Sequence, residues 1–198
     1  NRSSGKQGYA IAAALQELGA ETILVSGPTA LDAPKGVTMQ RVETAQEMHD
    51  AVHEALPADI AICVAAVADW RPEVSHGDKL KKGAGGDAAE LKLTENPDIL
   101  KSIASDDHRP ELVIGFAAET NNMIDHAREK LARKGCDWVI ANDVSPASST
   151  VKGGAMGGDR NAISIITNDN IENWPAASKL ALAQKLSRKI AKFVNKQA

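Results

Sequence analysis

Apolar stretches with helical spacing alternate with short, almost continuous apolar runs along most of the 198 residues. Between Gln7 and Leu18 the apolar residues share one helical face, and Gly19 is placed to end that helix. The run from Asp59 to Val67 (DIAICVAAV) is instead typical of a central strand covered on both faces. This alternation predicts an α/β fold with a doubly wound, mostly parallel, Rossmann-like sheet.

The other apolar stretches continue the same order of elements. Thr44 and Glu47 have the spacing of a capping box at the start of a helix. Further strands are expected at 22–25, 37–42, 112–117, 137–141 and 162–167, and further helices at 44–56, 98–105, 121–134 and 176–194. No internal repeat or low-complexity linker divides the chain, so we expect a single domain over residues 1–198.

Two polar, glycine-rich segments interrupt this order, at about 71–90 and about 145–161. They are long for ordinary connections, which favours a mobile flap for the first and a glycine-rich loop for the second. Ordinary surface loops are the alternative interpretation.

Composition restricts the classes of partner. The net charge of −3 and the lack of a cationic amphipathic segment argue against binding of nucleic acid or a membrane. No apolar run approaches the length of a spanning helix, and the first residues do not resemble a signal peptide. The two cysteines, Cys63 and Cys136, lie in apolar runs and are expected to be reduced core residues. We therefore expect a cytoplasmic location.

Ligands of such sheets bind beyond the carboxyl ends of the strands, where this sequence places several polar groups. Asp69 ends the AAVADW segment, although it could equally cap the next turn. Phe116, in GFAAET, could stack on a base, although core packing is commoner for phenylalanine. Asn142 and Asp143 end the following strand. Polar groups after consecutive strands together predict one site at this edge.

Three further motifs carry charge or hydroxyl groups. Ser3, Ser4, Gly5 and Lys6 precede a helix and could bind phosphate, although a serine–glycine helix cap is common and the spacing is not that of a Walker A loop. DKLKK places Lys79 and two other lysines on the proposed flap, where they could close over a triphosphate or be merely solvated. NPDIL forms a strand-to-helix corner.

Taken in order, the motifs resemble a known family. NRSSGKQG, LVSGP, AAVADW, DKLKK, NPDIL, GFAAETNN, ANDV and a Gly-Asp-x-Asn loop resemble the phosphopantothenoylcysteine synthetase (phosphopantothenate–cysteine ligase) family. In many bacteria this family forms the carboxyl-terminal half of a bifunctional coenzyme A biosynthesis protein, behind a flavin-dependent decarboxylase. The resemblance implies that CTP, with Mg²⁺, activates the carboxylate of 4'-phosphopantothenate as an acyl-cytidylate and releases pyrophosphate. The amine of cysteine then displaces CMP. ATP is used by related ligases elsewhere, and spacing does not indicate which base is bound.

The resemblance also implies roles for individual residues. Lys79 matches a flap lysine that stabilises the first half-reaction, and Asn1 matches an asparagine that handles the acyl-cytidylate. Contacts with the nucleotide are implied for Lys79 and for Cys63, Val64, Ala65, Asp69, Pro97, Asp98, Ile99, Leu100, Phe116, Lys130 and Lys134. Metal ligands are not implied. Members of the family are dimers with the active site near the subunit interface, so we expect a homodimer.

The family normally carries a strand upstream of Asn1, with a Thr-x-Gly-Gly-Thr turn. The resemblance therefore implies that the first strand of the sheet is not in this chain.

Two other functions remain as alternatives. The opening SSG before a helix is similar to that of short-chain nicotinamide-dependent oxidoreductases, but those enzymes use Tyr-x-x-x-Lys, and the sole tyrosine, Tyr9, is followed four residues later by Ala13. A non-catalytic nucleotide-binding module would keep Phe116 and Asp69 without depending on Lys79.

Overall fold

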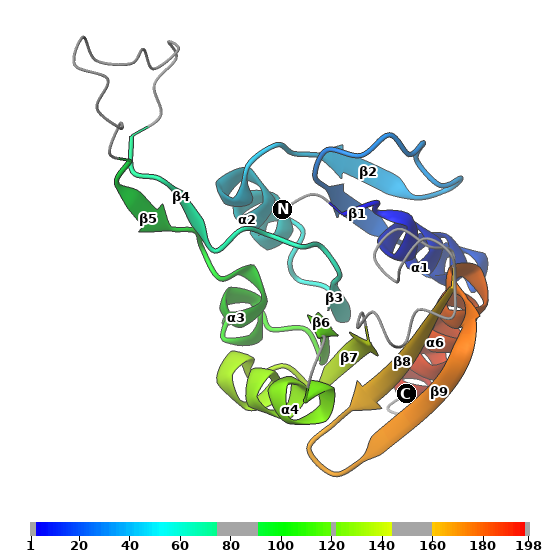
Figure 1. The fold of residues 1–198 in the computed structure, drawn as a ribbon. Helices are drawn as coiled ribbons and strands as arrows, with labels where there is room; N and C mark the ends of the chain where they lie inside the picture. The colour runs from blue at the N-terminus through cyan, green and yellow to red at the C-terminus, as the bar shows by residue number, and fades with distance from the viewer. Residues whose placement is uncertain (1–2, 75–90, 120–121, 144–159, 197–198) are drawn as a thin grey trace, which may run out of the picture.

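The computed structural model describes residues 3–74, 91–119, 122–143 and 160–196 (Figure 1). Its helices are α1 (Lys6–Glu17), α2 (Ala45–Glu54), α3 (Ile99–Ala104), α4 (Met123–Lys134) and α6 (Lys179–Val194). Its strands are β1 (Ile23–Ser26), β2 (Thr38–Arg41), β3 (Ile60–Cys63), β4 (Trp70–Pro72), β5 (Leu93–Glu95), β6 (Leu112–Glu119), β7 (Trp138–Asp143), β8 (Arg160–Ile166) and β9 (Ile171–Ser178).

The main sheet has five strands in the order β3-β6-β7-β8-β9. β3, β6 and β7 run parallel to one another, whereas β8 and β9 are antiparallel to their neighbours. β1 and β2 form a separate parallel pair, and β4 and β5 form an antiparallel ribbon that projects from the body (Figure 1). The predicted α/β fold is confirmed, and the sheet that was predicted to be mostly parallel is mixed, with β3, β6 and β7 as its parallel part.

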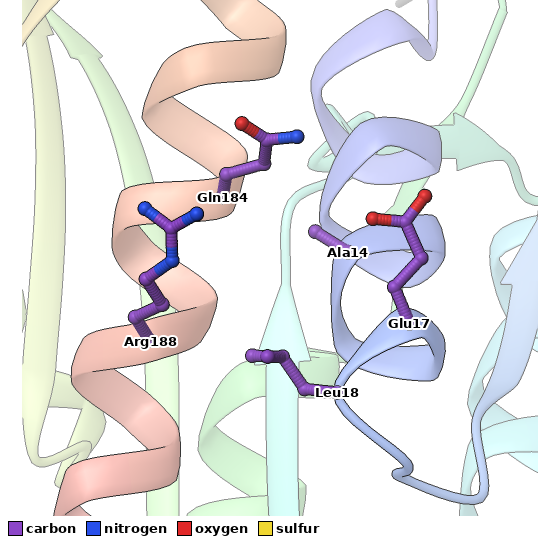
Figure 2. A pocket seen from close by; sticks show the side chains of 5 residues that line it. All are labelled: Ala14, Glu17, Leu18, Gln184 and Arg188. Atoms are coloured by element: carbon purple, nitrogen blue, oxygen red, sulfur yellow. The ribbon is translucent and has the colours of Figure 1, made fainter.

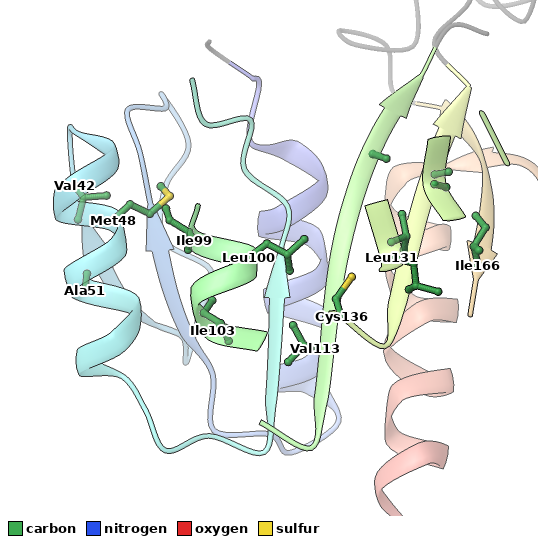
Figure 3. Close-up of a cluster of buried hydrophobic side chains, with 14 residues drawn as sticks. Val42, Met48, Ala51, Ile99, Leu100, Ile103, Val113, Leu131, Cys136 and Ile166 are labelled. Atoms are coloured by element: carbon green, nitrogen blue, oxygen red, sulfur yellow. The ribbon is translucent and has the colours of Figure 1, made fainter. Parts of the chain in front are cut away.

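Helices cover both faces of the main sheet. α1 and α6 lie side by side on one face (Figure 2), over a cluster that includes Leu112, Ile114 and Ile140. α2, α3 and α4 pack around a second cluster, which includes Val113 and Val139 (Figure 3). All five of these strand residues are fully buried. Alternate side chains of β6 and β7 pack into the two clusters, one on each face of the sheet. Across the described residues, no helix combines the length and apolar character needed to cross a membrane.

The capping box predicted at the start of α2 is present. Glu47 N–H donates to Thr44 Oγ1 at 3.1 Å, and Thr44 N–H donates to Glu47 Oε2 at 3.3 Å. Gly19, just beyond α1, has φ 92°, in the left-handed region expected of a glycine that ends a helix.

Two predicted elements differ from the structure. The strand expected over 59–67 is only β3, which ends at Cys63, and its residues are half-buried; β6 is the more buried strand. Small apolar residues continue past the last ladder pair, so the apolar run overstates the strand. The helix predicted from 176 begins at Lys179, because β9 returns antiparallel to β8 through a turn in which Thr167 N–H donates to the Asn170 carbonyl at 2.9 Å.

In the described part of the chain, β1 pairs only with β2, and β3 pairs only with β6. Each therefore has one edge without a strand partner among these residues, which is a position where another strand could pair. α1 packs against both β1 and α6. A further strand upstream of Asn1 stays a prediction.

Candidate active site

The carboxyl ends of β3, β6 and β7 lie at one edge of the sheet, as parallel pairing requires. Asn96 joins two of the predicted segments there. Its backbone N–H donates to the Asp69 carbonyl at 2.8 Å, and its Nδ2 donates to the Ala68 carbonyl at 2.8 Å. The exposed Asp69 is thereby held beside the corner at Pro97, which the sequence alone could not establish.

Asp98 occupies the start of α3 and makes two polar contacts. Its Oδ1 accepts from Lys101 N–H at 3.2 Å, and its Oδ2 accepts from Lys134 Nζ. Burial acts to raise the pKa of this carboxyl, but the hydrogen bonds from Lys134 and Lys101 outweigh it and hold the pKa below its ordinary value. Asp98 is therefore ionised and paired with Lys134, and an incoming phosphate would compete for this lysine.

Lys130, one turn before Lys134 on α4, reaches the end of β6. Its Nζ donates to the Phe116 carbonyl at 2.6 Å. The Phe116 side chain packs against the other face, with the cluster beneath α1 and α6. α4 thus brings two predicted lysines to two different parts of the edge, the end of β6 and the start of α3.

Ile99 and Leu100 are buried core residues (Figure 3). Leu100 lies against Gly115, where an added Cβ would come within 2.6 Å of Leu100 Cδ2. These two side chains therefore define the position of the corner through packing.

The two cysteines flank Gly115 on the same face. Cys63 is its neighbour on β3, and Cys136 Sγ would lie 3.7 Å from a Cβ at Gly115. Although Cys63 as a residue keeps some exposure, burial of its thiol, with a contribution from Cys136, raises the pKa to about 12. Burial also raises the pKa of Cys136. Both cysteines are free thiols, as predicted.

We expect neither thiol to react quickly with a thiolate-directed reagent in the folded protein, because a raised pKa leaves little thiolate at about pH 8. Titration with a chromogenic disulfide should detect almost no thiol before denaturation and both afterwards. Rapid reaction of either thiol in the folded protein, at the rate of free cysteine, would contradict this account.

Asn142 and Gln7 each carry a buried side-chain oxygen without a partner in the structure. Asn142 Oδ1 lies near the end of β7, on the same face as Ile140 and Phe116 by strand alternation. Gln7 Nε2 donates to the Lys179 carbonyl at 3.5 Å, whereas its Oε1 has no partner. Buried polar atoms are nearly always paired, so each of these oxygens is a place where a water molecule or a ligand atom could bind. The sequence placed Asn142 at this edge without a role and gave no signal for Gln7.

The predicted phosphate-binding residues lie at the start of α1. Ser3, Ser4 and Lys6 are exposed. Gly5 precedes the helix with φ 71°, and a Cβ there would meet Thr29 Cγ2 at 2.9 Å, so glycine is required. Gly8 faces Val64, which brings this helix start against the segment after β3, while Ala65 in that segment is exposed. Asn1 and Lys79 lie outside the described residues.

A shallow groove between α1 and α6 is lined by Ala14, Glu17, Leu18, Gln184 and Arg188 (Figure 2). It contains none of the predicted site residues. Its volume of about 50 Å³ is also far below that of a small-molecule site.

The described residues offer few ligands for a metal ion. They contain no group of three or more His, Cys, Asp or Glu side chains arranged to hold an ion. Mg²⁺ commonly needs only one or two carboxylates besides substrate phosphates. The exposed carboxylate of Asp69 fits that limited role.

Comparison with known proteins gives the family. Residues 1–194 match the DNA/pantothenate metabolism flavoprotein C-terminal domain. The chain is 43% identical to the coenzyme A biosynthesis bifunctional protein CoaBC of Vibrio parahaemolyticus over 98% of this chain and 48% of that protein. It is 43% identical to CoaBC of Escherichia coli over 94% of this chain and 45% of that protein.

A crystal structure of the C-terminal domain of CoaBC superposes with a TM-score of 0.79 at 35% identity, covering 99% of this chain and 86% of that one. The chain spans about half the length of the curated relatives it matches. The profile match over nearly every residue, together with the shared fold, places this chain in the DNA/pantothenate metabolism flavoprotein C-terminal domain family.

Proposed function

We propose that this chain is the phosphopantothenate–cysteine ligase domain of a coenzyme A biosynthesis protein. The observation that carries the proposal is the sheet edge at which Lys130 reaches the end of β6 and Lys134 pairs with Asp98 at the start of α3, in a chain similar to CoaBC over nearly its whole length. The paired and cationic side chains at this edge support the proposal that the nucleotide binds there.

In the first half-reaction, a carboxylate oxygen of 4'-phosphopantothenate attacks the α-phosphorus of CTP, and pyrophosphate leaves. In the second, the cysteine amine attacks the acyl carbon, the amide forms, and CMP leaves with the electron pair of the broken C–O bond while the amine loses a proton. Two anions must approach each other in the first step, so fixed cations lower the barrier. Lys130 and Lys134 supply that charge on one side of the nucleotide, and Lys79 adds to it. Mg²⁺, when bound with the triphosphate, neutralises further phosphate charge.

The oxidoreductase alternative is not favoured. The Tyr9 hydroxyl is buried and hydrogen-bonded to Ser26 Oγ at 2.9 Å and Thr29 Oγ1 at 2.8 Å. A phenol held in this way joins α1 to the end of β1 and is not presented to a substrate.

Isotope transfer tests the acyl-cytidylate directly. With a heavy-oxygen label in the carboxylate of 4'-phosphopantothenate, one labelled oxygen should appear in CMP when cysteine and CTP are supplied, as read by mass spectrometry. Label in inorganic phosphate instead would indicate an acyl phosphate. Formation of the amide without label in either product would contradict both forms of activation.

We propose that Asn142 binds 4'-phosphopantothenate, whose hydroxyl and amide N–H groups can donate to its unpaired Oδ1. We expect Asn142→Ala to raise the KM for phosphopantothenate about tenfold, because one buried hydrogen bond is lost. The KM for CTP should change much less. Asn195→Ala, at the exposed end of α6, is the control. Equal effects of the two variants would remove Asn142 from the site.

A homodimer is proposed as the working form, with the β4–β5 ribbon as the contact. Trp70 and Leu93 on this ribbon are each 55% exposed, and Val74 and Leu91 at its end are also exposed. Clustered exposed apolar side chains on a projecting element are typical of an interface.

We expect the double variant Leu91→Asp with Leu93→Asp to convert a dimer into a monomer, because it places two charges in a desolvated contact. Light scattering after size exclusion measures the mass. Leu180→Asp on α6, where the leucine is 57% exposed, is the matched control and should leave the mass unchanged. A dimer that survives the double change would exclude this ribbon as the contact.

The relatives are named bifunctional and are about twice as long as this chain. We propose that the complete protein carries a second activity, a flavin-dependent decarboxylase, in a fused domain.

A further inference from the structure

His53 connects the last turn of α2 to α3 and the loop that follows it. Its Nδ1 lies 2.9 Å from Asp106 Oδ2, and its Nε2 lies 2.9 Å from Ser102 Oγ. The side chains of His53 and Asp106 are only 23% and 22% exposed. The contact spans 53 residues of sequence between His53 and Asp106, so it is a tertiary contact between two parts of the fold.

The direction of these hydrogen bonds follows from proton counting. The backbone N–H of His108 donates to Asp106 and lowers the pKa of its carboxyl, and His53 lowers it further. The carboxylate therefore accepts, and Nδ1 donates. Ser102 Oγ also donates to the Ile99 carbonyl at 2.9 Å, and a hydroxyl has one proton. The Ser102 hydroxyl therefore cannot donate to the Ile99 carbonyl and to Nε2 at the same time.

Titratable side chains from α2 and from the loop after α3 surround the ring. The acidic side chains near His53 are Asp106, in the loop that follows α3, and Asp50 on α2. His49 on α2 has its ring centroid 4.4 Å from that of His53, and His108 lies in the loop with Asp106.

The arrangement has the order of a hydrolytic Ser–His–Asp triad but lacks its chemistry. The Ser102 hydroxyl donates to the Ile99 carbonyl, so its proton is not directed at Nε2. The nearby backbone N–H groups of Lys101 and Ser102 are already bonded to Asp98, so neither is free to stabilise an oxyanion.

The His53 contact and the pair of Asp98 with Lys134 together hold α3 at both ends. Asp98 fixes its first turn through Lys134, and His53 fixes Ser102 and the exit from the helix. α2 follows β2, and the β1–β2 pair shares no strand pairing with the main sheet in the described residues. The His53 contact therefore ties that unit to the helix that begins at the nucleotide corner.

We infer that His53 is a positioning residue for the nucleotide corner at Asp98–Leu100, acting through Ser102 and Asp106. This inference rests on the proposed ligase function. His53 touches neither substrate nor nucleotide in this role. It determines where α3 presents Asp98 and Leu100, and so how well the ground-state nucleotide binds.

His53→Ala should raise the KM for CTP about five- to tenfold with less than about a twofold change in kcat, because a positional change at the binding corner weakens uniform binding. His53→Asn keeps a donor near the Nδ1 position and should recover part of the affinity. Val52→Ala, one residue earlier and packed on the same core, is the control for lost stability alone. It should lower the melting temperature without raising the KM for CTP.

The outcomes separate this inference from the function on which it rests. No CTP-dependent turnover by the unaltered protein would overturn the ligase proposal itself. Turnover by the unaltered protein, with equal KM values for CTP in His53→Ala and Val52→Ala, would overturn only the positioning role. A fall in kcat at constant KM would also overturn it.

Discussion

Replacing Lys79 by glutamine is expected to lower kcat for pyrophosphate release at least about a hundredfold, the loss typical of one preorganised charge at a transition state. The resemblance assigns this lysine to the first half-reaction, in which a carboxylate attacks a triphosphate. CTP binding should persist, because Lys130 and Lys134 lie at the edge of the sheet independently of residue 79. Steady-state pyrophosphate release and equilibrium dialysis with CTP measure the two effects separately.

Lys192→Gln is the matched control, since it removes the same charge from an exposed position near the end of α6. It should leave kcat within about twofold, as expected of an exposed surface charge. Unchanged turnover in Lys79→Gln would remove this residue from the mechanism and favour a non-catalytic nucleotide-binding module.

Gly115→Val is expected to be the most destabilising of these substitutions. A Cβ at this position would lie 2.6 Å from Leu100 Cδ2, and valine adds two methyl groups beyond it on a buried strand. Overpacking of this kind lowers the free energy of unfolding by about 1–3 kcal/mol, and we expect the upper end because β6 is paired with a strand on each side. Urea denaturation followed by circular dichroism measures the change.

Leu100 provides the internal test of this explanation. The double variant Gly115→Val with Leu100→Ala should lose less stability than the sum of the two single variants, because the alanine removes the clashing methyl groups. Ala118→Val, on the same strand but exposed, should have little effect. Additive losses in the double variant would mean that the contact with Leu100 is not the cause.

The elements that could be predicted from sequence are those with a local signal. The capping box at Thr44 and the helical spacing that begins near Gln7 each depend on residues within a few positions of one another. β9 was missed because Trp174 is its one well-buried residue and Pro175 is unusual in a strand. Proline is tolerated there because β9 is at the edge of the sheet. The extent of β3 was overestimated for the opposite reason, since apolar residues continue where pairing stops.

For the site, too, the sequence predicted the residues of local motifs but not the contacts that depend on tertiary packing. Motif order placed Asp98 and Lys134 in one site, but their ion pair joins residues 36 positions apart and depends on how α3 and α4 pack. Asn96 was seen only as part of a corner, although it makes the hydrogen bonds that hold Asp69 beside Pro97. The contact between His53 and Asp106 had no sequence signal at all, because a lone histidine at the end of a helix is common.

The most direct test of the ligase assignment is pyrophosphate release by the purified protein with 4'-phosphopantothenate, Mg²⁺ and each of CTP, ATP, GTP and UTP, with and without cysteine. Release that is selective for CTP and requires phosphopantothenate is the predicted result. The same assay should be repeated on this chain extended at its amino terminus with the corresponding segment of the Escherichia coli relative. Absence of release with all four nucleotides in both proteins would contradict the assignment.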